Sequence, residues 1–354
     1  MKNNQFDNNK YNELLSIFNH NEKQSNVFMT NEYFEILPKL FTDENKWKFT
    51  TFSYAYLYLN TYMYRWSTYG QYIPKVNEIK EILGLYGNDK RYNDVIKKDG
   101  ILDAYGLTET VGVKDIPILN TVDEFEGLKF DFVSDIFPDS KCEIFKEWKN
   151  AKCITPKTTI KKPVLALHSN IKNDDFMGTF YNPNNFTNIP FEVFAFCMSK
   201  KELGVAGFFI YAYIKNGMET YKEEFKTSHR MIANKFGGAY TTIYDSLVAL
   251  IKHGLVERFL GQEEFSKAMP LEERQASIYT VLECAELFNK EGNVDYEKAS
   301  VLTVEEYKEI NKKEEKLENN IDKLTLDEIA ELLVQRHTDP KKKRAEIDLD
   351  QLPF

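Results

Sequence analysis

The chain has 354 residues, of which 42% are apolar and 14% aromatic; this composition can fill the cores of two ordinary domains and excludes wholesale disorder. The formal net charge of −9 is concentrated near the C-terminus, where residues 283–331 carry 15 acidic and 7 basic side chains, whereas residues 141–162 carry seven lysines and two glutamates. Because affinity for a polyanion depends on local charge, the total charge argues against nucleic-acid binding only weakly.

The sequence contains no recognisable machinery for catalysis, metal binding or membrane insertion. Its longest apolar run, residues 203–214, is shorter than the roughly 20 residues that span a bilayer, and the N-terminus lacks the apolar core of a secretion signal. The four cysteines form no Cys-x-x-Cys pair, and no phosphate-binding loop or His-x-His pair occurs. We therefore expect a cytoplasmic protein that is not an enzyme, has free thiols and binds neither a metal nor a cofactor.

A first module is expected at residues 26–136, after an N-terminal arm at residues 1–25. Apolar spacing predicts an aromatic helix over 52–64 and a second helix over 76–83, followed by a glycine turn at 84–87. A third helix over 89–98 and a strand that starts at Gly100 complete the module. This third helix would present its polar side chains to a ligand: Lys90, Arg91, Asn93 and Lys97.

Residues 137–184 have the composition of a basic connector. They contain turn-rich stretches around Pro156 and Pro183 and most of the lysines noted above. These lysines either follow phosphates between two modules or simply keep a linker solvated.

The second module, residues 185–284, has the clearest pattern. An apolar helix over 203–214 precedes a short helix whose start is marked by the hydroxyls of Thr227 and Ser228. A turn at Gly237 and Gly238 leads into a helix from Tyr240 with an apolar stripe on one side. Two strands, over 255–259 and 277–281, follow. Three helices and a two-stranded ribbon in this order are typical of a winged helix.

The two modules read as an internal repeat. Aligning Ile79 with Ile232 places Gly84 on Gly237 and, with one extra residue in the later turn, Gly100 on Gly254. The expected fold is therefore mainly α with small β wings (α+β), built from two tandem winged-helix domains and a charged helical tail. The alternative is that two unrelated helical hairpins share a glycine pattern by chance.

The tail, residues 285–354, predicts helices over 304–317 and 324–335 and ends in an acidic, aromatic tip. This tip resembles the C-terminal tip of bacterial single-stranded-DNA-binding proteins. The resemblance implies that a replication or repair enzyme binds the phenyl ring in a pocket and the carboxylates at a basic rim. The alternative is a plain charged terminus. The residues that would bind the partner are Asp348, Asp350, Leu352, Pro353 and Phe354.

The second module also resembles the replication initiators of low-GC bacterial plasmids and related phages. The matching motif positions are Ser228, Ile232, Ala233, Gly237, Thr241, Thr242, Leu250, Gly254, Leu255, Val256 and Glu257. The match covers about 60 residues and is shared with many transcriptional regulators. It implies a double-stranded-DNA partner at an origin. A transcriptional regulator and a protein-binding adaptor that never meets DNA are the alternatives. Separately, the apolar stripe of the helix predicted over 324–335 either packs on the second module or pairs with another copy in a homodimer.

We expect each module to lay its last helix in a major groove, so that the bound site spans roughly 20 base pairs. Thr241, Thr242 and Tyr244 would lie near base edges in one groove, and Lys90, Arg91 and Asn93 in the other. Arg230, Lys252 and Arg258 would hold phosphates, and Lys97 and Ser228 are the other candidate DNA-binding residues.

Overall fold

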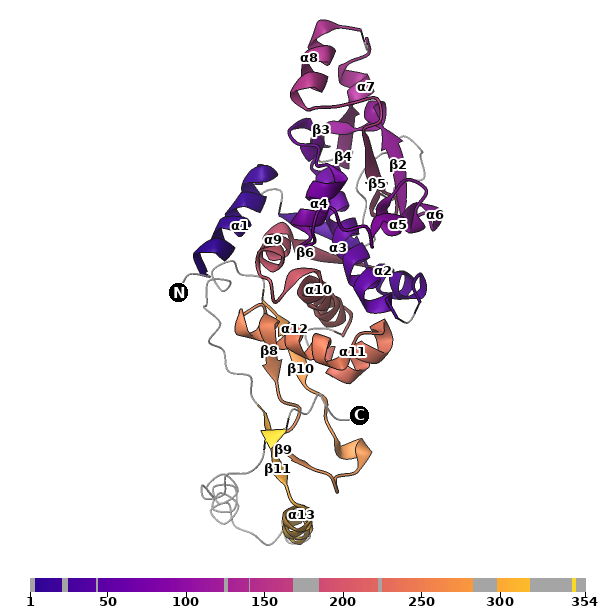
Figure 1. The fold of residues 1–354 in the computed structure, drawn as a ribbon. Helices are drawn as coiled ribbons and strands as arrows, with labels where there is room; N and C mark the ends of the chain where they lie inside the picture. The colour runs from indigo at the N-terminus through magenta and orange to yellow at the C-terminus, as the bar shows by residue number, and fades with distance from the viewer. Residues whose placement is uncertain are drawn as a thin grey trace.

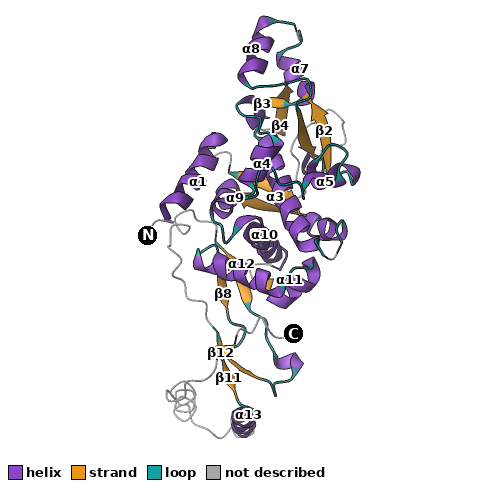
Figure 2. Cartoon of the chain, in the orientation of Figure 1, coloured by secondary structure: helices purple, strands orange, loops and turns teal. Residues whose placement is uncertain are grey.

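The structure is a computed structural model of an α+β protein, about half helical, with small and mostly antiparallel sheets. Helices gather in the middle of an elongated molecule, and lobes that contain strands extend from both ends (Figures 1 and 2). The structure describes residues 4–20, 25–42, 44–123, 127–139, 141–167, 185–221, 225–282, 298–318 and 346–347.

The helices and strands predicted in the second half are present, and the structure adds a helix at 191–199 and a strand at 225–226 that the sequence did not indicate. The helices of this half are α9 (Phe191–Ser199), α10 (Gly204–Tyr221), α11 (His229–Phe236) and α12 (Tyr240–Lys252). Its strands β7 (Phe225–Lys226), β8 (Val256–Phe259) and β10 (Ile278–Val281) form one antiparallel sheet in the order β7-β10-β8. The apolar stripe predicted on α12 is buried: Ile243, Leu247 and Leu250 are fully inaccessible and Ile251 is nearly so.

The first half contains α3 (Lys46–Arg65), α4 (Val76–Ile82), α5 (Asn93–Ile96), α6 (Ile101–Ala104), β2 (Thr108–Gly112) and β5 (Thr159–Pro163). The predicted helix over 89–98 is wrong, because only Asn93–Ile96 is helical, and Asp99 with φ 56° interrupts the chain before α6. The strand predicted at Gly100 is also wrong, since Gly100 is the residue before α6.

The two halves nevertheless repeat one hydrogen-bond pattern at a helix end, but the glycine of the first half that matches Gly254 is not the one the sequence predicted. After α12, Gly254 donates to the carbonyl of Ile251 and Leu255 to that of Leu250; after α6, Gly106 donates to Asp103 and Leu107 to Leu102. Both glycines have a left-handed φ, near 70°. The strand pairs end alike as well, because Leu282 donates to Leu255 and Val164 donates to Leu107. Gly106, and not Gly100, is the structural counterpart of Gly254.

Between β2 and β5 lies a lobe that forms one end of the molecule in Figure 1. It consists of the hairpin β3 (Pro117–Asp123) with β4 (Gly127–Phe132), then α7 (Val133–Ile136) and α8 (Glu143–Ala151). Residues 141–163, which the sequence places in a connector, thus contribute α8 and β5 to the first half. Strand β5 pairs with β2 along its whole length, from Thr108 opposite Pro163 to Gly112 opposite Thr159.

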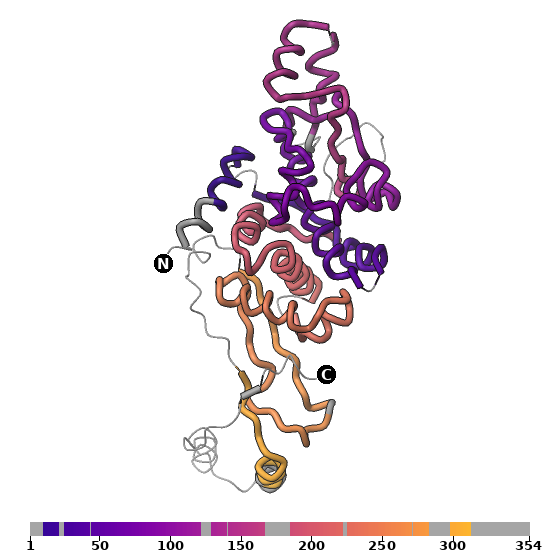
Figure 3. Tube along the Cα trace, in the orientation of Figure 1, coloured from indigo at the N-terminus to yellow at the C-terminus, as the bar shows by residue number. Residues whose placement is uncertain are grey.

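The two halves are joined by a ladder and by a common core. Strand β1 (Asn26–Thr30) pairs antiparallel with β6 (Phe186–Pro190), with Phe28 opposite Asn188. Helices α3 and α10 pack beneath this ladder, and a single cluster of buried side chains runs through both halves. The colour gradient in Figure 3 shows early and late segments side by side there.

The N-terminal arm and α2 (Tyr33–Ile36) belong to this core. Helix α1 (Asn4–Ile17) packs on α9, and Phe18, 2% exposed, contacts Tyr62, Tyr72 and Phe191. The side chain of His20 lies 2.7 Å from the Glu192 carboxylate, which fixes the end of the arm on α9.

The tail folds against the loop between β8 and β10. Strand β9 (Glu264–Ser266) in this loop pairs parallel with β11 (Ala299–Leu302), and β11 pairs antiparallel with β12 (Glu346–Ile347). Helix α13 (Val304–Glu318) begins where predicted, and Tyr307 on it donates to Glu273. The helix predicted over 324–335 lies outside the described residues. None of the described helices has the length and apolar character needed to cross a bilayer.

Candidate nucleic-acid interface

Helices α11 and α12 are joined by a sharp turn. The Ser228 hydroxyl accepts a hydrogen bond from the Met231 amide at 3.2 Å and caps the start of α11, as the sequence predicts. Gly237 ends the helix in the left-handed conformation, with φ 70°, which a residue with a side chain adopts only at a cost. Two residues later Ala239 precedes α12 without a side-chain cap. The chain therefore changes direction between Gly237 and Ala239, and α12 starts on a new axis.

The face of α12 opposite the core is open. Thr241 and Thr242, in its first turn, are both exposed, as are Asp245 and Lys252 further along. Tyr244 is half-buried, and its ring stands edge-on to the His229 ring at 5.2 Å, so it supports α11 from the side. Hydroxyls and a carboxylate on one exposed helix face are groups that read base edges, since a carboxylate accepts from the cytosine amino group. Asp245 was not among the sequence candidates.

The cationic candidates of this half differ in how available they are. Arg230 is exposed at the first turn of α11, and Lys252 is exposed at the last turn of α12. Arg258 is half-buried and donates from Nε to the Ser277 hydroxyl at 3.0 Å, so it also braces β8. Ser228 is 1% exposed and its hydroxyl caps α11, so it stabilises the start of the helix and is not accessible to DNA.

The start of α3, in the first half, packs against the turn between α11 and α12. The Trp47 indole lies 3.0 Å from where a side chain on Gly238 would start, and the Lys46 stem lies 2.8 Å from the same point on Gly237. A further link is the ion pair between Lys235 on α11 and Glu35 on α2, at 2.7 Å. Sequence reasoning missed Lys46 and Trp47, because nothing local indicates that the start of α3 packs on a turn about 190 residues later in the chain.

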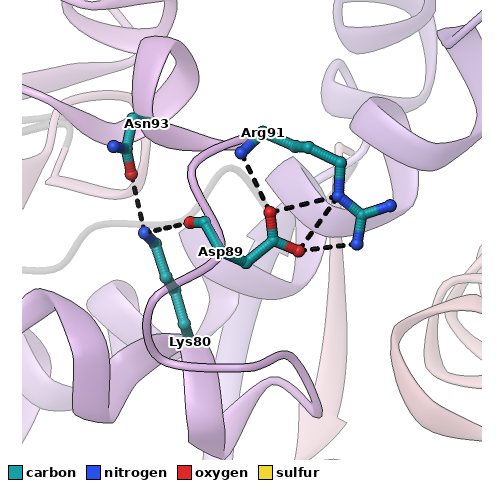
Figure 4. Close-up of polar contacts among 4 residues, drawn as sticks. All are labelled: Lys80, Asp89, Arg91 and Asn93. Carbon is teal, nitrogen blue, oxygen red and sulfur yellow. Dashed lines mark hydrogen bonds and ion pairs between the residues drawn. The ribbon is translucent and has the colours of Figure 1, made fainter.

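The basic candidates of the first half do not form a matching surface. Arg91 binds the Asp89 carboxylate through Nε and Nη2, at 3.0 and 2.6 Å, and this hydrogen bonding holds the pKa of Asp89 below its usual range (Figure 4). Lys97 pairs with Asp94 at 2.6 Å. Each of these cations therefore has an adjacent aspartate that offsets its attraction for a phosphate.

Lys80 explains why no long helix presents these residues. Its ammonium donates to the backbone carbonyl of Asp89 and, at 2.6 Å, to Oδ1 of Asn93, as Figure 4 shows. The carbonyl of Asp89 is thus bound outside any helix, and the Asn93 amide oxygen is occupied. Lys90 is exposed on the same irregular loop. The structure brings Lys90, Arg91 and Asn93 together, but on a loop and a four-residue helix.

The remaining site predictions concern the acidic tip and metal binding. Asp348, Asp350, Leu352, Pro353 and Phe354 lie outside the described residues. Within the described ranges, no three His, Cys, Asp or Glu side chains gather as a metal site would require. Cys142, Cys153 and Cys197 are free thiols, and Cys284 also falls outside the described part of the chain.

No family model, curated protein or solved structure matches the chain.

Proposed function

We propose that residues 204–282 form a winged helix that binds double-stranded DNA in a sequence-specific manner, with α12 in the major groove. The observation that carries the proposal is the exposed face of α12, where Thr241 and Thr242 project from the first turn while the opposite stripe fills the core. The order of three helices and the sheet order β7-β10-β8 support it, because this arrangement holds one helix outward from a compact scaffold.

Charge around α12 fits this proposal. Arg230 and Lys252 are exposed near opposite ends of the helix pair, where they can contact phosphates on the two sides of a groove. Asp245 lies between them on the reading face. A carboxylate there lowers general affinity for DNA and favours sites that place a cytosine amino group opposite it.

The proposal is tested by binding to DNA from the region around its own gene. We expect a specific complex that weakens steeply with salt, and we expect the double variant Thr241→Ala, Thr242→Ala to lose about tenfold or more in preference for that site while affinity for unrelated duplex changes little. Mobility shift across a salt series measures both quantities. Thr121→Ala, an exposed threonine on β3 in the distant lobe, is the control. Equal affinity of the native protein for any duplex contradicts the proposal.

The role we propose for this contact is initiation of plasmid or phage replication, as the resemblance of the motif around Gly237 implies. If the acidic tip recruits a replication enzyme, deleting residues 348–354 should abolish maintenance of a plasmid that depends on this protein and leave its DNA affinity unchanged. A maintenance assay paired with mobility shift checks this. Stable inheritance of the plasmid with the truncated protein would show that recruitment does not run through the tip.

A further inference from the structure

We propose that Lys46, from the first half of the chain, completes the DNA-contacting surface by binding a backbone phosphate beside the start of α12. This inference rests on the function proposed above. It makes the interface a joint product of both halves, although only the second half carries the winged-helix pattern.

The position of Lys46 is set by the turn of the second half. Atoms Cβ, Cγ and Cδ of its stem lie 3.2, 3.2 and 2.8 Å from the point where a side chain on Gly237 would begin. The stem of Lys46 thus occupies the space that a side chain at position 237 would fill. The ammonium is two bonds beyond Cδ, and Thr241 follows Gly237 by only four residues. The stem of Lys46 therefore packs on the turn that leads into α12.

The start of α3 cannot slide away from this position. Trp47, the residue after Lys46, is 7% exposed and contacts Phe209 on α10 edge-on at 5.7 Å, and its indole atoms Cδ2 and Cε3 lie 3.0 and 3.1 Å from where a side chain on Gly238 would begin. A buried indole between two elements fixes the backbone that carries Lys46. Fixing the stem in advance lowers the conformational entropy that a lysine loses when it binds a phosphate.

Comparison with Lys235 shows which cation is available. Lys235 also lies near the turn, but it pairs with Glu35 at 2.7 Å and its ammonium stands 5.1 Å from the centre of the Tyr213 ring. Burial lowers the pKa of Lys235, but the hydrogen bonds and charges of Glu35 and Tyr213 together outweigh burial and raise it. Across the described residues no carboxylate pairs with Lys46. We therefore assign the phosphate contact to Lys46 and not to Lys235, which is paired with Glu35.

The test compares full-length variants on two duplexes, one from around the protein's own gene and one unrelated. Lys46→Met removes the charge and keeps the stem on Gly237. We expect affinity to fall about three- to tenfold on both duplexes alike, and the slope of log K against log salt to become shallower by about 0.9. Lys46→Arg should retain native binding. Lys114→Met, an exposed lysine between β2 and β3, changes total charge equally and should leave the slope unchanged.

The outcomes separate this inference from the proposed function. If the native protein prefers no duplex, the proposed function fails. If the native protein binds specifically and the threonine variant loses preference, but Lys46→Met keeps the native slope, only the role of Lys46 fails. A loss confined to the specific duplex also overturns it, because a phosphate contact is independent of sequence. Urea unfolding of each variant checks that the fold is intact, and Lys46→Gln repeats the test if the Met variant is unstable.

Discussion

Phe209→Ala should destabilise the whole protein by about 3–5 kcal/mol, in one transition. Phe209, on α10, is fully buried, and its ring contacts three aromatic side chains of the first half and one of the second: Phe34, Trp47, Tyr54 and Phe236. The ring therefore occupies the boundary between the halves. Removing it opens a cavity that neither half can close alone.

Urea unfolding measures this effect with two probes. All three tryptophans, Trp47, Trp66 and Trp148, precede β6, so fluorescence reports on the first half and, through Trp47, on its boundary with the second, whereas circular dichroism reports on helices of both. We expect both midpoints to shift together. Phe259→Ala removes a ring that is 53% exposed and should change stability by less than about 0.5 kcal/mol. A shift of the dichroism midpoint with fluorescence unchanged would show that the halves unfold separately.

Asp103→Ala should cost about 3–5 kcal/mol, because it leaves the Lys161 ammonium buried without a carboxylate to balance its charge. The two side chains are 11% and 7% exposed and lie 2.6 Å apart, joining α6 to β5. The Asp103 carboxylate also accepts hydrogen bonds from the hydroxyls of Thr108 and Thr110. Thermal or urea unfolding checks the value. Asp94→Ala removes the exposed pair with Lys97 and should cost no more than about 1 kcal/mol.

The same pair predicts a pH dependence. Burial opposes ionisation of Asp103, but hydrogen bonds from Lys161, Thr108 and Thr110 outweigh it, so its pKa is lowered in the folded protein. A carboxyl with a lowered pKa stabilises the fold above its unfolded value, about 3.9, and loses this contribution as the pH falls through the folded value. The difference in stability between native protein and Asp103→Ala should therefore be constant near neutral pH and shrink below about pH 4. A constant difference down to pH 2 would contradict this assignment.

The second half could be predicted closely because its signals are local. The Ser228 cap, the left-handed glycines Gly237 and Gly254, and the apolar stripe of α12 each act within a few residues of their own position. The exposure of Thr241 and Thr242 follows from the same periodicity. The burial of Ser228 does not follow from it, because a hydroxyl that caps a helix is also a plausible phosphate ligand.

The first half was predicted less well because distant residues decide its local structure. Lys80 binds the carbonyl of Asp89, and Lys161 on β5 donates to the carbonyl of Lys97 at 3.0 Å, which is 64 residues away in the sequence. These long-range contacts fix the interruption between α5 and α6, where a helix was predicted. They also explain why the sequence alignment matched Gly100, and not Gly106, to Gly254. An uninterrupted helix over 89–98 would have ended at Gly100.

The pairing of β1 with β6 can form only late in the synthesis of the chain. Val27 pairs with Ile189, so 162 residues must leave the ribosome before the partner of the first strand can appear. At a typical elongation rate this takes about 8–30 s. Throughout that interval the nascent chain presents an unpaired strand edge, which invites association with other chains. Production of this protein should therefore depend on chaperones that shield early-emerging segments, and slower translation should lengthen that dependence.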